Sequence, residues 1–136
     1  MSKKYSNVND SQRETIIALA VLVVISMAAR LLFMGRHLEG WDSIDFALGL
    51  HDYDIEYYQP HFPGYPVYMS FCWLVHLFTD SDVFALIVPG VLFGSITLVP
   101  LFYLARRMFA EKVAWLTAIL FILNPLCWLQ SEKALS

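Results

Sequence analysis

An uncharged run of 23 residues, VFALIVPGVLFGSITLVPLFYLA at 83–105, limits what this chain can fold into more than any other feature. A helix of that length crosses the hydrocarbon layer of a bilayer, because it rises about 1.5 Å per residue and the layer is roughly 30 Å thick. Residues 15–34 carry one charge and residues 113–130 carry none. These three runs predict three transmembrane helices and an all-α integral membrane protein.

The composition agrees with a membrane protein. Hydrophobic residues make up 58% of the chain and charged residues 15%. Soluble domains average about 45–50% apolar and 25% charged residues. The net charge is −3 and no long basic run is present. We therefore expect membrane lipid among the partners and no nucleic acid.

The positions of the basic residues predict the orientation. The cationic side chains before the first run and between the last two are Lys3, Lys4, Arg13, Arg106, Arg107 and Lys112. Basic loops face the cytoplasm, so we expect a cytoplasmic tail at 1–14 and a cytoplasmic turn at 106–112, in the plasma membrane. Residues 131–136 then lie on the outer side.

Two crossings must separate the two cytoplasmic segments, and this condition decides how the apolar segment 67–78 is interpreted. It has twelve residues and contains His76, so it is too short to cross comfortably. We expect it to lie along the outer interface as an amphipathic helix. The alternative is a short tilted span, with the opposite orientation downstream.

The outer loop at 35–82 concentrates the polar chemistry of the chain. It holds eight of the twelve acidic residues and all four histidines, and Arg36 is its single basic residue. Residues 41–52 show helical periodicity, which predicts a second interfacial helix with two faces. The expected apolar face is Trp41, Ile44 and Leu48, meeting lipid or neighbouring spans, and the expected polar face is Asp42, Asp45, Gly49 and Asp52.

Asp42 is the leading candidate for a catalytic carboxylate, because it begins this helix at the depth of the membrane surface. The alternative is structural. Aspartate is a good N-cap residue, and Asp42 could accept a hydrogen bond from the backbone amide of Ile44 or Asp45. Asp42 and Asp45 together could also bind a divalent ion, although two carboxylates alone are a weak signal.

Residues 59–65, QPHFPGY, predict a rigid turn, because two prolines restrict the backbone and Gly64 permits an unusual conformation. The turn presents His61 among aromatic neighbours. Gln59 and His61 could contact a substrate, or the turn could serve only to redirect the chain into the next helix.

The segments GWDSIDFALGL and YYQPHFPGYPVYM, which follow a cytoplasmic start and one span, resemble the N-terminal part of GT-C glycosyltransferases. The similar pattern is that of bacterial relatives of protein O-mannosyltransferases and of the aminoarabinose transferase of lipid A. The segment LARRMFAEKVAWLTAILFILNP looks like the second cytoplasmic turn and third span of this family, so the resemblance extends from about residue 15 to the end.

The resemblance implies transfer of a sugar from a polyprenyl-phosphate donor to an acceptor on the outer side of the membrane. It implies Asp42 as the catalytic base. Asp45, Gln59, His61 and Tyr65 are the expected substrate contacts, and a divalent metal is a candidate cofactor without an assigned ligand set.

Members of this family have several hundred residues. We therefore expect this chain to be an N-terminal portion that is inactive alone and requires a separately encoded C-terminal half. A different class remains open: a small non-catalytic membrane protein that binds a partner or lipid through its acidic, aromatic outer loop.

Overall fold

The computed structural model describes residues 2–38 and 40–132, with side chains described for 12–38 and 40–128. The described part contains helices and no β-strand, which confirms the predicted all-α class. Its elements are α1 (Ser2–Leu32), α2 (Trp41–His51), the 3-10 helix η1 (Ile55–Tyr57), α3 (Pro66–His76), α4 (Asp82–Ile96), α5 (Leu98–Met108), α6 (Glu111–Leu123) and α7 (Pro125–Glu132). The helices expected at 41–52 and 67–78 are therefore present as α2 and α3.

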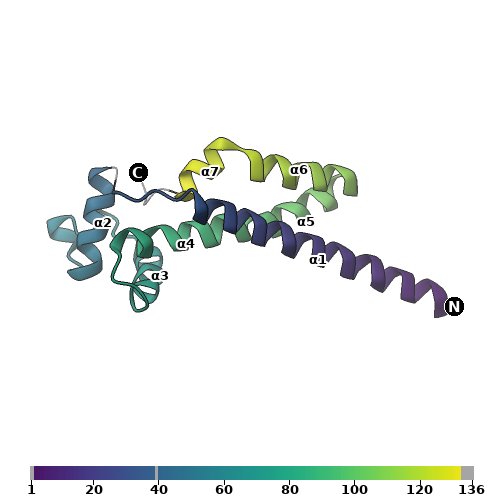
Figure 1. Ribbon diagram of the computed structural model, residues 1–136, viewed down its shortest axis with the longest axis horizontal. Helices are drawn as coiled ribbons and strands as arrows, with labels where there is room; N and C mark the ends of the chain where they lie inside the picture. Colours follow the sequence, from purple (N-terminus) through teal and green to yellow (C-terminus); the bar gives the residue numbers. More distant parts are fainter. Residues whose placement is uncertain (1, 39, 133–136) are drawn as a thin grey trace.

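Three long rods form the body of the molecule: α1, α4 with α5, and α6 with α7 (Figure 1). Helix α1 contacts α4, α5 and α7, and α5 packs along α6. Helices α2 and α3 gather at one end of the rods, whereas the N-terminus of α1 and the turn between α5 and α6 lie toward the other end (Figure 1).

Among the described residues, two helical segments are long and apolar enough to cross a membrane, Gln12–Leu32 and Asp82–Met108. The second consists of α4 and α5, which join at Thr97. Thr97 keeps helical backbone angles, and its hydroxyl donates a 2.7 Å hydrogen bond to the carbonyl of Phe93. The nearby Pro100 has no N–H to donate within the helix, which explains why the rod is interrupted here.

The third apolar run is not one continuous helix. It divides into α6 and α7 at Asn124, whose side-chain oxygen accepts hydrogen bonds from the amides of Leu126 (2.9 Å) and Cys127 (3.4 Å). Pro125 occupies the first position of α7, where a missing N–H costs nothing. An asparagine cap followed by proline thus starts a new helix inside a stretch that its lack of charge predicted to be a single span.

Two clusters of buried side chains hold the helices together. The first joins α2, α3 and α4 through residues that include Phe46, Met69, Cys72 and Leu86. The second joins α1, α5 and α6 through Leu19, Leu98, Phe102, Ala105, Ala114 and Ala118. The first cluster fixes the outer helices on α4, and the candidate site lies on those outer helices.

Arg30 is the largest fully buried side chain of the described part and links three rods. Its guanidinium donates to the hydroxyl of Ser95 on α4 at 3.3 Å and lies 5.9 Å from the ring centroid of Phe121 on α6. A buried guanidinium persists only where hydrogen bonds and ring faces replace water. Arg30 therefore ties α1 to both other rods.

Candidate functional site

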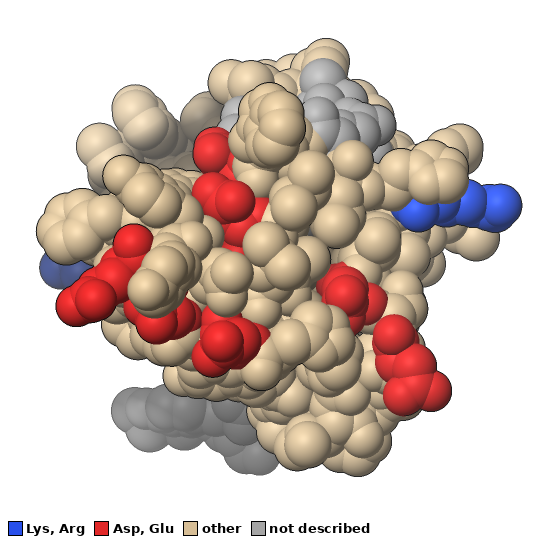
Figure 2. All heavy atoms as spheres, turned by 90° about the vertical axis from the view of Figure 1, so that its left-hand side faces the viewer, with Lys and Arg blue, Asp and Glu red and all other residues tan. Residues whose placement is uncertain are grey.

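Acidic side chains are spread over the end of the molecule that carries α2 and α3. Figure 2 looks onto this end and shows several acidic groups between neutral side chains, with basic groups only at the edges of the view. Such a surface repels anions and raises the local concentration of cations.

Helix α2 begins after Gly40, and this decides between the two interpretations of Asp42 as a cap or as a free carboxylate. Gly40 has the extended backbone of an N-cap residue, and its carbonyl accepts the amide of Ile44 at 3.2 Å. Asp42 is the second residue inside the helix and is exposed. The alternative in which Asp42 is the N-cap is therefore wrong. Its carboxylate is stabilised by the helix dipole and points to solvent.

The side of α2 that packs is not the expected apolar face. The three residues of that face are largely exposed: Trp41 at 84%, Ile44 at 41% and Leu48 at 45%. The buried residues of α2 are Ser43, Phe46, Ala47, Gly49 and Leu50. Trp41, Ile44 and Leu48 are therefore not buried against the described helices, as a packed apolar face would be.

Hydrogen bonds hold the predicted turn at 59–65 in place, and within it the amide of Gly64 donates to the carbonyl of His61 at 2.9 Å. Asp54 and Gln59 pair through two backbone hydrogen bonds of 2.7 and 2.8 Å. The hydroxyl of Tyr53 donates to the carbonyl of Gly64 at 2.9 Å. Gly64 has φ +83°, and a Cβ there would lie 2.6 Å from that hydroxyl. Only glycine fits this position without strain.

Gly49 lets this turn lie directly on α2. A Cβ at position 49 would lie 2.8 Å from Cδ of Pro60, closer than carbon atoms approach in proteins. Gly49 is one helical turn after Asp45 on the same face of α2. The close approach of Pro60 therefore carries His61 to the carboxylates of that face.

Asp42, Asp45 and His61 form a compact group. One ligand atom from each side chain lies within 4.8 Å of the other two. The distance from Nδ1 of His61 to Oδ2 of Asp45 is 3.9 Å, and this Nδ1 atom is buried without a hydrogen-bond partner. Asp42 opens to solvent, whereas the side chains of Asp45 and His61 are each 26% exposed. The group can accept a proton or hold a cation.

Aromatic edges position the imidazole of His61. Its ring centroid lies 5.3 Å from that of Phe46 and 5.6 Å from that of Tyr65. Tyr65 also precedes α3 as its N-cap residue, with φ +44°. Gln59 contributes its backbone to the closure of the turn, and no side-chain hydrogen bond involves it within the described residues.

An apolar groove of about 490 Å³ adjoins Tyr65. It is lined by Tyr65, Pro66, Val67, Tyr68, Phe71 and Phe93. The hydroxyl of Tyr68 donates to the backbone carbonyl of Leu86 at 2.6 Å, which fixes one wall against α4. Tyr65 therefore contacts His61 and also lines the groove.

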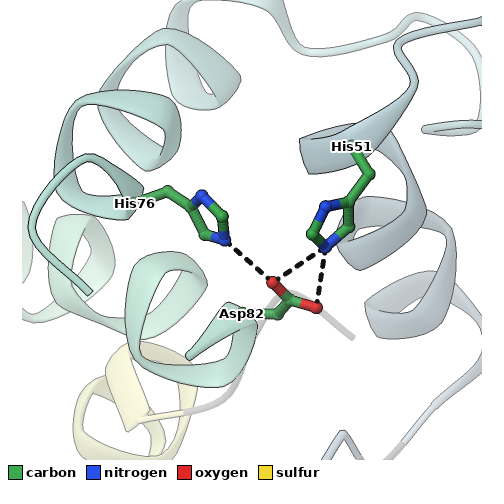
Figure 3. A group of neighbouring side chains, drawn as sticks. All are labelled: His51, His76 and Asp82. Carbon is green, nitrogen blue, oxygen red and sulfur yellow. Dashed lines mark hydrogen bonds and ion pairs between the residues drawn. The ribbon is translucent and has the colours of Figure 1, made fainter. Parts of the chain in front are cut away.

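A second group of polar side chains, which the sequence did not single out, lies where three helices meet. His51 ends α2, His76 ends α3 and Asp82 begins α4 (Figure 3). Nε2 of His51 lies 3.1 Å from each carboxylate oxygen of Asp82, and Nε2 of His76 lies 3.0 Å from Oδ1. The spacing of these residues along the chain gives no signal of their proximity, because it depends on how the helix ends are placed.

Comparisons with known proteins add no assignment: no family model, curated protein or solved structure matches this chain.

Proposed function

We propose that this chain contributes the first-loop part of the active site of a GT-C membrane glycosyltransferase. The enzyme transfers a sugar from a polyprenyl-phosphate donor to an acceptor on the outer side of the plasma membrane. The observation that carries this proposal is the convergence of Asp42, Asp45 and His61 at the end of the rods opposite the basic turn. Two separate sequence segments supply the group, and both belong to the pattern that resembles this family.

The surface of α1 supports a membrane environment. Six of its described aliphatic side chains are each more than half exposed: Ile16, Ile17, Val21, Val24, Ile25 and Leu32. A contiguous aliphatic surface of this kind is unfavourable in water and favourable in lipid. With α1 and α4–α5 crossing, α2 and α3 lie at the outer surface, where a lipid-linked sugar is presented.

Asp42 suits the role of general base because it is exposed beside a half-buried carboxylate and an imidazole. In the proposed reaction it accepts the proton of the acceptor hydroxyl while the hydroxyl oxygen attacks the anomeric carbon. The bond from that carbon to the phosphate oxygen breaks, and polyprenyl phosphate leaves with the bonding electrons. His61 is a positioning residue beside Asp42.

The apolar groove beside Tyr65 suits the isoprenoid chain of the donor. Its lining is entirely aromatic, proline and aliphatic, and one lining residue, Tyr65, contacts the imidazole of His61. A lipid chain in this groove would bring its phosphate end toward the carboxylate group. The groove therefore explains how one site could handle both an isoprenoid tail and a polar reaction.

A divalent cation fits the same group. Two carboxylate oxygens and a buried imidazole nitrogen without a hydrogen-bond partner are suitable ligands. When bound, such an ion would offset the charge of the departing phosphate. Asp45 and His61 are the residues that would hold it, which leaves Asp42 for the acceptor.

The first test is sugar transfer in membranes of the source organism that carry Asp42→Asn in this gene. We expect transfer from polyprenyl-phosphate sugar to fall by about 10²- to 10⁴-fold, the usual contribution of a general base. The matched control is Asp80→Asn, an exposed aspartate on the same outer segment and outside the group. Equal activity in both variants at equal protein level would contradict the assignment and favour a non-catalytic partner protein.

A further inference from the structure

The group formed by His51, His76 and Asp82 lies apart from the proposed transfer site. His51 follows Asp42 by nine residues, which is about two and a half helical turns, so the two side chains leave α2 on opposite sides. No residue of the group belongs to the pattern that resembles glycosyltransferases at Asp42 or at the turn 59–65. It therefore requires its own explanation.

The donor atoms have the spacing of ligands around one small metal ion. In a tetrahedral zinc site with bonds of about 2.0–2.1 Å, neighbouring ligand atoms lie roughly 3.3–3.4 Å apart. Here Oδ1 of Asp82 is 3.1 Å from Nε2 of His51 and 3.0 Å from Nε2 of His76. All three donor atoms lie within 4.8 Å of one another. A shift of a few tenths of an ångström would accommodate an ion.

The directions of the side chains agree with this spacing. In Figure 3 both imidazole rings turn their Nε2 edges toward the carboxylate of Asp82. The two rings are perpendicular to each other, with an interplanar angle of 89° and centroids 5.4 Å apart. Each nitrogen lone pair can therefore point at a shared centre without the rings colliding.

The chemistry of the donors selects the class of metal. Two imidazole nitrogens and one carboxylate favour zinc and related transition metals over magnesium or calcium, which prefer oxygen ligands. The side chain of His51 is 59% exposed, so a water molecule can fill the fourth position from the solvent side. The exposed acidic residues Asp52 and Asp80 flank the group in sequence and favour the arrival of a cation.

We propose that His51, His76 and Asp82 bind one Zn²⁺ ion that clamps the ends of α2 and α3 to the start of α4. The ion has a structural role, because it crosslinks three helices whose mutual placement also sets the position of the transfer site. In the absence of metal, His51 and His76 are both hydrogen-bonded to the carboxylate of Asp82. Zinc replaces those hydrogen bonds with stronger bonds.

The test is zinc binding by the full chain, purified in detergent without a histidine tag and stripped with a chelator. Competition with a chromophoric chelator gives affinity and stoichiometry, and Co²⁺ substitution reports coordination geometry by its visible absorption. We expect one zinc per chain, an absorption typical of four-coordinate cobalt, and a Tm that rises by a few degrees with zinc. The variants are His51→Ala, His76→Ala and Asp82→Asn.

Loss of a ligand should raise the Kd by more than the roughly 10- to 100-fold that loss of an outer-shell partner causes. The controls are His37→Ala, an exposed histidine outside both groups, and His61→Ala, which removes the other candidate metal ligand. His51→Ala is the decisive variant, because its exposed side chain can be removed without opening the core.

Zinc binding by the wild type that is lost in His51→Ala and kept in both controls supports the proposal. The proposal is overturned if the wild type does not bind zinc, if His51→Ala still binds it, or if His61→Ala is the only variant that loses it. None of these measurements uses sugar transfer, so this proposal can fail while the proposed function stands, and the reverse also holds.

Discussion

The polar residues of the outer end owe their positions to small or apolar neighbours. The imidazole of His61 packs against the rings of both Phe46 and Tyr65, and Gly49 leaves room for Pro60, the residue before His61. Asp42 and Asp45 could be identified from helical periodicity, and His61 from the proline and glycine around it. Their convergence could not be identified from the sequence, because it depends on Pro60 lying so close to Gly49 that no Cβ would fit there.

Cys72 supplies a prediction at this scale. Burial raises the pKa of its thiol to about 12, and the side chain has no exposed surface. A raised pKa keeps the thiol protonated until the pH approaches that value, whereas an ordinary cysteine ionises near pH 8.5. In a Cys127→Ser background, we expect N-ethylmaleimide to leave Cys72 unlabelled between pH 7 and about pH 10 and to label it fully after denaturation. Mass spectrometry measures the labelling of the native and of the denatured chain. Rapid labelling of Cys72 in the native chain at pH 8 would show that its thiol is not buried.

The helices themselves were largely predictable, and their interruptions were not. Periodicity predicted the extent of α2 but not its buried side, and the apolar stretch at 67–78 predicted the extent of α3 to within two residues. The run at 113–130 was expected to be one span because it carries no charge. Asn124 and Pro125 divide it, since a capping side chain and a proline together start a helix more strongly than apolar composition extends one.

Gly49→Ala tests the contact between α2 and the turn. Alanine in a helix interior ordinarily stabilises by about 1 kcal/mol relative to glycine. Here the new Cβ would collide with Pro60, and overpacking typically costs about 1–3 kcal/mol. We therefore expect a lower Tm and weaker sugar transfer, because His61 moves away from the carboxylates.

The control for this change is Leu48→Ala, a neighbouring residue of α2 that is 45% exposed. It should leave the Tm nearly unchanged. A Gly49→Ala variant that is more stable than the wild type would show that the turn does not rest on α2 as described.

At the scale of the whole molecule, acidic and basic side chains gather at opposite ends of the rods. Helices α2 and α3 lie at one end, where acidic side chains are spread over the surface, and the basic turn after α5 lies at the other end (Figures 1 and 2). The positions of lysine and arginine along the chain predicted this separation, because the positive-inside rule depends on sequence alone. The packing of α3 beside α4, which creates the apolar groove, could not be predicted, because it depends on which faces of two uniformly apolar helices meet.

The most direct test of the proposed transfer site is photo-crosslinking of a polyprenyl phosphate that carries a reactive group in its isoprenoid chain. Label is expected in the peptides that line the groove, around Tyr65 to Phe71 and at Phe93. Excess unlabelled polyprenyl phosphate should remove it, and ordinary phospholipid should not. Label confined to the exposed aliphatic face of α1, unaffected by either competitor, would mean that the lipid only surrounds the protein and would contradict the account.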